Sequence, residues 1–285
     1  LHVPAAHELL QRFRFIPDAR LDDLMISYAS DGGGVGPHLD AYDVFLVQVH
    51  GRRRWRIGPV SNPKLTPNLP LKILRQFKPR QEWVLEPGDM LYLPPGWGHD
   101  GIAQGECMTC SVGFRASSDA ELASEVLTRV AESTLESIEE GAGSLYADPS
   151  QAATPHPGLV PPALQRFVSQ AVKRALQDAQ TLHTALGETL SEPKPNTWFD
   201  PGASLQALLR QGSGVALSSR SRMLYDERCV YLNGESFVAS GTDALLMRRL
   251  ADSRHLSAQE VARLTQAARR LLDTWCQDGW VGPES

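Results

Sequence analysis

The stretch GGGVGPHLDAYDVFLVQVHGRRRWRIG, residues 32–58, decides how this sequence is interpreted. It opens with glycines, places His38 and Asp40 two residues apart, continues as an apolar run and ends in a cluster of arginines. Because side chains alternate between the two faces of a strand, His38 and Asp40 are expected on the same face. An imidazole and a carboxylate placed one pleat apart can supply two ligands to one metal ion.

The third ligand must come from elsewhere in the chain, and His99 is the best candidate. It ends the motif PGDMLYLPPGWGH, which contains a turn and the predicted strand Met90–Leu93. A His-x-Asp pair with a distant histidine is the facial triad of non-haem Fe(II) oxygenases, which leaves coordination positions open. A closed structural zinc site would more often use four cysteine or histidine ligands. A His-x-Asp pair alone arises often by chance, whereas the two motifs together favour a metal site of His38, Asp40 and His99.

The arginine cluster divides between the two faces of its predicted strand. Arg53 shares a face with Trp55 and Ile57, and this more apolar face is expected to point inward. An isolated buried cation is costly, and a carboxylate ligand would offset that cost. The planar guanidinium suits bidentate carboxylate recognition. The arginines expected to be solvated on the other face are Arg52, Arg54 and Arg56.

Composition limits the class of protein. The 285 residues are 42% hydrophobic, enough for two or three domains, and the net charge of −5 argues against general nucleic-acid coating. No apolar run approaches the roughly 20 residues of a membrane span, and the start lacks a signal-peptide pattern. The four cysteines are too scattered for a disulfide scaffold, and Cys107 and Cys110 would point to opposite faces of a strand. We therefore expect a cytoplasmic protein that does not bind membranes.

Short runs separated by glycine and proline turns make the first part of the chain β-rich, which is typical of a sandwich or barrel. The predicted strands are Leu24–Tyr28, Val44–Val49, Arg54–Ile57, Trp83–Leu85, Met90–Leu93 and Thr109–Phe114. A capping box, Ser118 to Glu121, then opens an amphipathic helix. A second helix carries an apolar face with Leu164, Phe167, Val168, Ala171, Val172 and Leu176.

The last part of the chain has the pattern of a winged-helix-like module. Val230–Phe237 predicts a hairpin with an Asn-Gly turn. Helices are predicted at about Thr242–Ala251 and at Ser257–Cys276, the latter opened by a second capping box. The predicted domains are therefore residues 1–117, 118–192 and 193–285.

The motifs GGGVGPHLDAYDVF, GRRRWRIG, LEPGDMLYLPPGWGH and SVGFR together resemble the bacterial ribosomal oxygenases of the JmjC class. The resemblance implies a double-stranded β-helix (cupin) barrel followed by a helical dimerisation region and a winged helix. It also implies an Fe(II)- and 2-oxoglutarate-dependent dioxygenase that uses O2 to 3-hydroxylate an arginine of ribosomal protein L16. Such relatives have a longer segment before the DDLMIS strand, so we expect the N-terminal part of the barrel domain to be missing.

The resemblance also assigns roles to individual residues. It makes His38, Asp40 and His99 the catalytic iron ligands and Arg53 the partner of the distal carboxylate of 2-oxoglutarate. The further hydroxyl contacts to 2-oxoglutarate would be Ser27 and Ser111. For an arginine substrate, a carboxylate at the mouth should hold the guanidinium, and Asp31 is the candidate. A turn-forming role for Asp31 is the alternative.

Other functions remain open at this stage. Histidyl hydroxylases of ribosomal proteins and lysyl demethylases share the metal triad, so the target residue rests on resemblance alone. A cupin binding module without catalysis would keep the barrel but would not need the complete triad and Arg53. A DNA-binding regulator that uses the winged helix is disfavoured by the acidic charge balance, and direct nucleic-acid binding is undecided.

Overall fold

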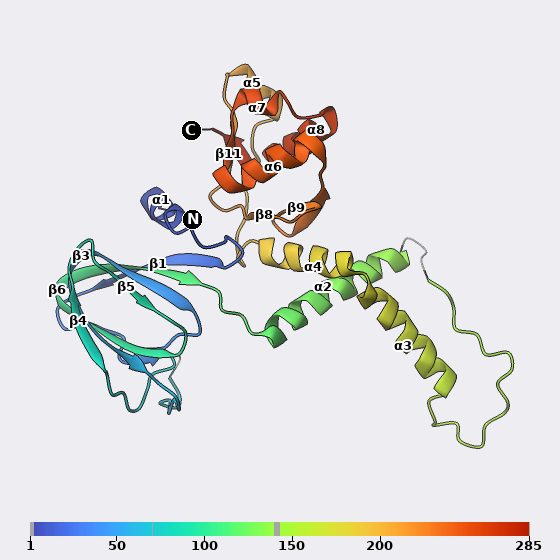
Figure 1. Cartoon of the computed structure of the whole chain (residues 1–285), viewed down its shortest axis with the longest axis horizontal. Coiled ribbons are helices and arrows are strands. Elements are labelled where there is room, and N and C mark those ends of the chain that lie inside the picture. The colour runs from blue at the N-terminus through green and yellow to red at the C-terminus, as the bar shows by residue number, and fades with distance from the viewer. Residues whose placement is uncertain (1–2, 70, 140–142, 285) are drawn as a thin grey trace. The chain divides into compact units, whose positions relative to one another are not determined.

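The computed structural model describes residues 3–69, 71–139 and 143–284. The chain divides into two compact units, Leu1–Ser117 and Ser118–Ser285 (Figure 1). The first unit holds the predicted β-rich part, and the second holds the helices and the winged helix. No helix within the described residues is both long and apolar enough to cross a membrane.

The first unit is an antiparallel barrel of β-strands preceded by a short helix, α1 (Pro4–Gln11) (Figure 1). The strand order is β1-β6-β3-β4, with β2 paired to β6 and β5 paired to β3. The strands are β1 (Leu21–Ala29), β2 (His38–Leu39), β3 (Asp43–Pro59), β4 (Gln81–Leu85), β5 (Met90–Leu93) and β6 (Trp97–Phe114). The predicted cupin-type barrel is confirmed.

Strand β3 replaces two predicted strands, Val44–Val49 and Arg54–Ile57. The turn expected between them at His50 and Gly51 was wrong. The residues from Asp43 to Pro59 form one strand, and its pairing with β6 shifts register on either side of His50. Gly51 has a φ of 60°, and a Cβ atom there would lie 1.9 Å from the carbonyl oxygen of Glu106. The glycine therefore lets β3 bulge without leaving the sheet, since only glycine tolerates this approach.

The barrel strands bury apolar residues on both faces. One buried cluster consists of Val44, Leu46, Trp55, Ile57, Leu85 and Leu93. On the opposite face of β3, Phe45 and Val47 pack with a second cluster that contains Phe13 and Phe114. Helix α1 contributes Leu9 and Leu10 to this second cluster. Helix α1 was not predicted, although its proline at the first turn is a helix-start signal.

The second unit begins with three helices, one more than predicted. They are α2 (Asp119–Glu139), α3 (Pro162–Gln177) and α4 (Ala179–Ser191). The capping box at the start of α2 is confirmed, because Ser118 and Glu121 exchange hydrogen bonds between side chain and backbone. Helix α4 was missed; it starts at Asp178, whose carboxylate accepts a hydrogen bond from the Gln180 N–H at 3.0 Å.

The C-terminal part of this unit has its own core, which includes Leu232, Leu250, Leu272 and Trp275. Its elements are α5 (Leu205–Arg210), β7 (Val215–Leu217), β8 (Met223–Tyr225), β9 (Cys229–Leu232), β10 (Glu235–Val238), α6 (Gly241–Ser253), β11 (His255–Leu256), α7 (Ala258–Val261), α8 (Gln266–Gln277) and β12 (Val281–Pro283). The β9–β10 hairpin is confirmed as predicted.

The long helix predicted from Ser257 to Cys276 was wrong. The capping box of Ser257 and Glu260 opens only α7, and Thr265 caps a separate helix α8 through its hydroxyl. A second helix start inside an apolar periodic segment is hard to detect, because the threonine cap has no glutamate three residues later to mark it.

Candidate metal centre

The three predicted metal ligands meet at one end of the barrel. Strand β2 pairs with β6 so that His38 lies directly opposite His99, and their ring centroids are 4.1 Å apart. Asp40 follows β2, and its Oδ2 atom lies 3.4 Å from Nε2 of His99. One ligand atom from each of the three residues lies within 4.8 Å of the others. The geometry therefore brings together residues that are distant in sequence.

Backbone carbonyls orient both imidazoles. Nδ1 of His38 lies 2.9 Å from the Gly36 oxygen, and Nδ1 of His99 lies 3.2 Å from the Trp97 oxygen. A carbonyl oxygen can only accept, so each Nδ1 carries a proton and Nε2 is the ring nitrogen that remains for other contacts. Each Nε2 is therefore left as the atom able to bind a metal ion.

The charge state of the cluster also suits a cation. Burial lowers the pKa of His38, and the neighbouring His99 adds to this effect, which favours a neutral imidazole. The hydrogen bond from His99 lowers the pKa of Asp40 against the opposing effect of burial, so its carboxylate stays charged. A donor set of two imidazoles and one carboxylate fits a first-row transition metal such as Fe(II), whereas magnesium and calcium prefer all-oxygen sites.

Arg53 points into the barrel, as the alternation of the strand predicted. It is 5% exposed, and its guanidinium lies 5.0 Å from the Trp55 ring centroid. Nη1 donates to Ser27 Oγ at 3.1 Å and to Thr109 Oγ1 at 3.4 Å, and Nη2 donates to the Gly101 oxygen at 3.4 Å. Within the described residues Arg53 makes no ion pair, and its Nε has no hydrogen-bond partner.

An unpaired buried guanidinium is a costly feature that calls for a compensating anion. Burial lowers the pKa of Arg53, although arginine remains charged at any physiological pH. Because its hydrogen-bond partners among the described residues are all neutral, a ligand carboxylate would be favoured beside this buried cation. The barrel thus holds a candidate metal site and a candidate anion site.

Ser27, Ser111 and Asp31 differ in how they relate to this site. Ser27 contacts the Arg53 guanidinium directly, and its hydroxyl also donates to the Thr109 carbonyl at 3.3 Å. Ser111 lies on β6 opposite Met25 and is half-buried. Asp31 accepts a hydrogen bond from the Gly105 N–H at 2.7 Å, so one of its oxygen atoms holds a turn. Asp31 is exposed, and within the described residues only its Oδ1 atom accepts a hydrogen bond.

One of the arginines expected to be solvated has a different environment. Arg56 forms an ion pair with Asp100, whose side chain is 3% exposed, so the expectation of full solvation was wrong for Arg56. The two residues are directly opposite each other on β3 and β6. Arg54 lies 3.8 Å from Glu82 on the exposed surface, in agreement with the prediction.

Sequence reasoning missed three residues around Arg53: Gln48, Thr109 and Gly101. Thr109 and Gln48 are fully buried and hydrogen-bonded to each other. A Cβ atom on Gly101 would lie 2.6 Å from the Trp55 ring and 2.9 Å from Arg53 Nε. The alternation of β6 could have indicated Thr109, but the contact with Gln48 depends on the irregular part of β3.

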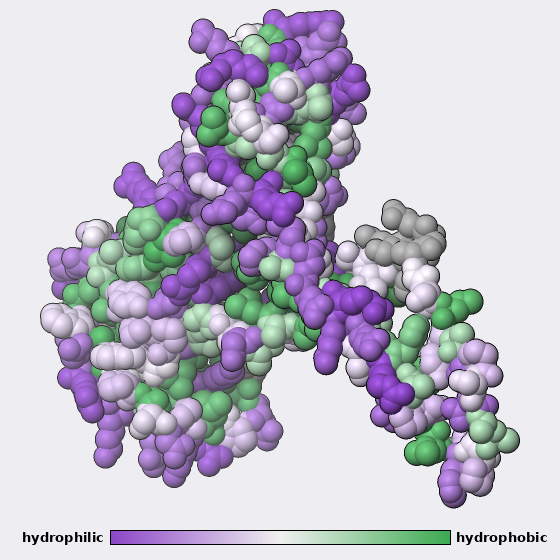
Figure 2. Space-filling view, turned by 45° about the vertical axis from the view of Figure 1, so that its right-hand side comes forward, coloured by the Kyte–Doolittle hydropathy of each residue, from purple (hydrophilic) through white to green (hydrophobic). Residues whose placement is uncertain are grey.

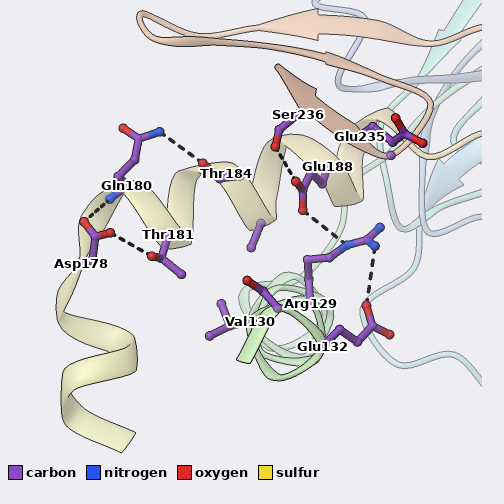
Figure 3. Close-up of a pocket in the computed structure, with 13 residues that line it drawn as sticks. Arg129, Val130, Glu132, Asp178, Gln180, Thr181, Thr184, Glu188, Glu235 and Ser236 are labelled. Carbon is purple, nitrogen blue, oxygen red and sulfur yellow. Dashed lines mark hydrogen bonds and ion pairs between the residues drawn. The ribbon is translucent and has the colours of Figure 1, made fainter. Parts of the chain in front are cut away.

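A cavity of about 480 Å³ lies in the second unit between α2, α4 and the β9–β10 turn (Figure 3). Arg129 is 3.6 Å from Glu132 and 3.8 Å from Glu188, and Glu188 accepts a hydrogen bond from Ser236 at 2.6 Å. The charged groups around this cavity therefore pair with one another and join α2 and α4 to the hairpin. The hairpin predicted from the sequence contributes Gly234, Glu235 and Ser236 to this cavity.

The fold and the site define a class: a cupin-type barrel with a two-histidine, one-carboxylate candidate metal centre, followed by a winged helix. Comparison with protein-family models agrees, because residues 8–122 match the JmjC domain and residues 174–282 match the ROXA-like winged helix. The chain belongs to the JmjC-type ribosomal oxygenases.

Individual relatives support this membership. The chain is 36% identical over 254 residues to the ribosomal protein uL16 3-hydroxylase of Escherichia coli, covering 86% of this chain and 65% of that protein. The crystal structure of E. coli ycfD superposes with a TM-score of 0.81 at 32% identity, covering 98% of this chain and 75% of that one. The complex of YcfD with cobalt and 2-oxoglutarate gives a TM-score of 0.77 at 30% identity, with the same coverage. The chain thus spans about two thirds of the length of the E. coli hydroxylase.

Proposed function

We propose that this chain is an Fe(II)- and 2-oxoglutarate-dependent protein hydroxylase. The observation that carries the proposal is the pairing of two features in one barrel. These are the cluster of His38, Asp40 and His99, and the buried Arg53, which has no ion pair within the described residues. A non-catalytic binding module would need neither open metal coordination nor a separate carboxylate receptor. The relationship to YcfD, whose structure holds cobalt and 2-oxoglutarate, supports the same assignment.

In this proposal each residue has a defined task. His38, Asp40 and His99 would hold the Fe(II) ion, and three protein ligands rather than four would suit a catalytic role. Arg53 binds the distal carboxylate of 2-oxoglutarate, with Ser27 beside it and Ser111 as a further hydroxyl on the late strand. When bound, Fe(II) supplies the activation of O2 that unactivated C–H bonds require. The buried environment of Arg53 strengthens its interaction with the carboxylate by excluding water.

The proposed substrate is an arginine of ribosomal protein L16, hydroxylated at carbon 3. The support is the 36% identity to the E. coli uL16 3-hydroxylase. Asp31 is the carboxylate proposed to hold the substrate guanidinium, because its second oxygen remains available while the first holds the Gly105 turn. Ribosomal proteins are made in the cytoplasm, so this substrate would place the activity there.

Mass spectrometry of L16 tests the substrate assignment. Purified L16 is incubated with the Fe(II)-loaded protein, 2-oxoglutarate and oxygen, and tryptic peptides are sequenced. The proposal predicts a gain of one oxygen atom on an arginine side chain. Oxygen on a histidine of another ribosomal protein would instead favour the histidyl hydroxylases. Loss of a methyl group from lysine would favour a demethylase.

We also propose that the helical region, residues 118–192, mediates a homodimer, with residues 193–285 as the separate winged helix. The support is that α3 has no buried residue, and that Val168 and Val172 on its apolar face are each about half exposed. Hydrophobic side chains are visible on the surface among hydrophilic ones (Figure 2). An unpartnered apolar stripe is expected to be covered by another chain or element. Analytical ultracentrifugation of the wild type and of Val172→Asp tests this; a dimer that persists in the variant would contradict the assignment.

A further inference from the structure

We propose that Gln48 and Thr109 form a positioning pair that orients the guanidinium of Arg53 toward its carboxylate ligand. The inference rests on the proposed function, because it concerns how the 2-oxoglutarate receptor is held in place. It is carried by a chain of hydrogen bonds that begins at the bulge in β3 and ends at Arg53. Both Gln48 and Thr109 are fully buried.

The side chain of Gln48 forms hydrogen bonds with the backbone of the bulge in β3. Its Nε2 atom donates to the carbonyl oxygens of His50 at 2.7 Å and Gly51 at 3.2 Å. The register of β3 against β6 shifts on both sides of His50, so its ladder is interrupted there. The glutamine amide therefore supplies donors to carbonyls next to the interruption, which a buried apolar side chain could not do.

The directions of the remaining hydrogen bonds follow from this contact. Because Nε2 donates to two carbonyls, the orientation of the amide is fixed and Oε1 must be an acceptor. Oε1 lies 2.9 Å from Thr109 Oγ1, so the single hydroxyl proton of Thr109 points toward Gln48. The Thr109 oxygen is then left as an acceptor, and Arg53 Nη1 donates to it at 3.4 Å. The hydrogen bonds that join Gln48, Thr109 and Arg53 can therefore run in one direction only, with Arg53 donating to Thr109 and Thr109 donating to Gln48.

The bulge explains why this arrangement is needed. Residues 48 and 53 are an odd number apart, so in a regular strand their side chains would point to opposite faces. The register shifts bring both to the same face, where Thr109 contacts each of them. By holding the bulge and accepting from Thr109, Gln48 links the local backbone geometry to the position of the guanidinium. Ser27, the other acceptor of Nη1, comes from a different strand and does not depend on the bulge.

Removing the amide should weaken carboxylate binding without affecting the metal ligands. In Gln48→Leu the side-chain volume is similar, but Thr109 loses its acceptor and can turn its proton toward Arg53. The guanidinium then faces a competing donor, and we expect the affinity for 2-oxoglutarate to fall about tenfold. Thr109→Val removes the hydroxyl oxygen that accepts from Arg53 Nη1, and we expect a similar loss. Thr109→Ser keeps the hydroxyl and is the conservative variant that should restore wild-type affinity.

Calorimetric titration of the cobalt-loaded protein gives the test. Each variant is titrated with 2-oxoglutarate and with 2-oxobutyrate, which has the same keto-acid end but no distal carboxylate. The inference predicts that Gln48→Leu and Thr109→Val weaken binding of 2-oxoglutarate only, while 2-oxobutyrate and Co(II) bind as in the wild type. A general structural disturbance would weaken both keto acids equally and would overturn the inference. Should Gln48→Leu fail to fold, Thr109→Val and Thr109→Ser decide it alone.

Arg53→Leu separates this inference from the proposed function. If Arg53→Leu also leaves 2-oxoglutarate affinity unchanged, the carboxylate receptor itself is wrong, and the proposed function loses its main support. If Arg53→Leu weakens 2-oxoglutarate binding but Gln48→Leu and Thr109→Val do not, only the positioning role is overturned.

Discussion

Asp40 and His99 come from separate parts of the sequence, and their carboxylate oxygen and imidazole nitrogen lie 3.4 Å apart. The contact exists because β2 pairs with the beginning of β6, which sets His38 opposite His99 and leaves Asp40 beside them. The hydrogen bond lowers the pKa of Asp40, so the side chain presents a charged oxygen to the same point as two imidazole nitrogens. This convergence is the basis for the first prediction.

Asp40→Ala should lower the affinity for Co(II) or Mn(II) more than about 100-fold, because even partners of metal ligands contribute up to that factor. Calorimetric titration with the metal alone measures the effect. Glu82→Ala is the matched control, since Glu82 is an exposed carboxylate of the same unit that lies beside Arg54. Equal affinity in Asp40→Ala and Glu82→Ala would mean that the metal binds elsewhere.

Gly101→Ala should weaken 2-oxoglutarate binding by displacing Arg53. The added methyl group would meet the Trp55 ring at 2.6 Å and Arg53 Nε at 2.9 Å, so the guanidinium must move. We expect a loss of about tenfold or more in affinity for the metal-loaded protein. Gly113→Ala on the same strand is the control, because its nearest contact would be an ordinary 3.8 Å. Identical binding by the two variants would contradict the packing described for Arg53.

Gly187→Ala should destabilise the second unit, although alanine is the better helix former. A Cβ atom at this position in α4 would lie 2.3 Å from the Tyr231 ring, and we expect a loss of about 1–3 kcal/mol in the free energy of unfolding. Without the clash the substitution would stabilise the helix by about 1 kcal/mol. Chemical denaturation gives the sign, and Gly158→Ala, which meets nothing within 4 Å, serves as the neutral control. A more stable Gly187→Ala variant would show that α4 does not pack on Tyr231.

Alkaline pH should destabilise the second unit partly through Cys276. Burial raises the pKa of this thiol from 9.0 to about 12. The thiol loses its proton more easily in the unfolded chain, so its contribution to stability is complete below pH 9.0 and declines as the pH rises toward about 12. The free energy of unfolding of the wild type should therefore fall more steeply over this range than that of Cys276→Ala. Parallel slopes would mean that the thiol is not buried as described.

The nearness of His38 to Asp40 and the inward position of Arg53 could be predicted because both follow from the alternation of side chains along a strand. His38 and Asp40 are two residues apart, and Arg53 alternates with Trp55 and Ile57, so a period of two was sufficient. The barrel and the β9–β10 hairpin could likewise be predicted, because glycine and proline turns and an Asn-Gly pair separate their strands in the sequence.

The hydrogen bonds that link Gln48 and Thr109 to Arg53 could not be predicted, because they depend on the bulge in β3. Alternation assigns Gln48 and Arg53 to opposite faces, and only the shifted register around His50 brings them together. The bulge at His50 and Gly51 was predicted as a turn between two strands, because a His-Gly pair between two strand-like runs is compatible with a turn and with a bulge. Helix α1 and the break between α7 and α8 were missed because their start signals are weak: α1 has only a proline in its first turn, and α8 starts at a threonine cap with no glutamate three residues later.

The most direct test of the central claim is the conversion of 2-oxoglutarate to succinate by the Fe(II)-loaded protein, measured with and without ribosomal protein L16. The account predicts succinate in amounts that match the oxygen gained by an L16 arginine, and none from Asp40→Ala. A wild-type protein that binds Fe(II) and 2-oxoglutarate yet releases no succinate with L16 present would contradict it. Succinate formation by Asp40→Ala at the wild-type rate would contradict it equally.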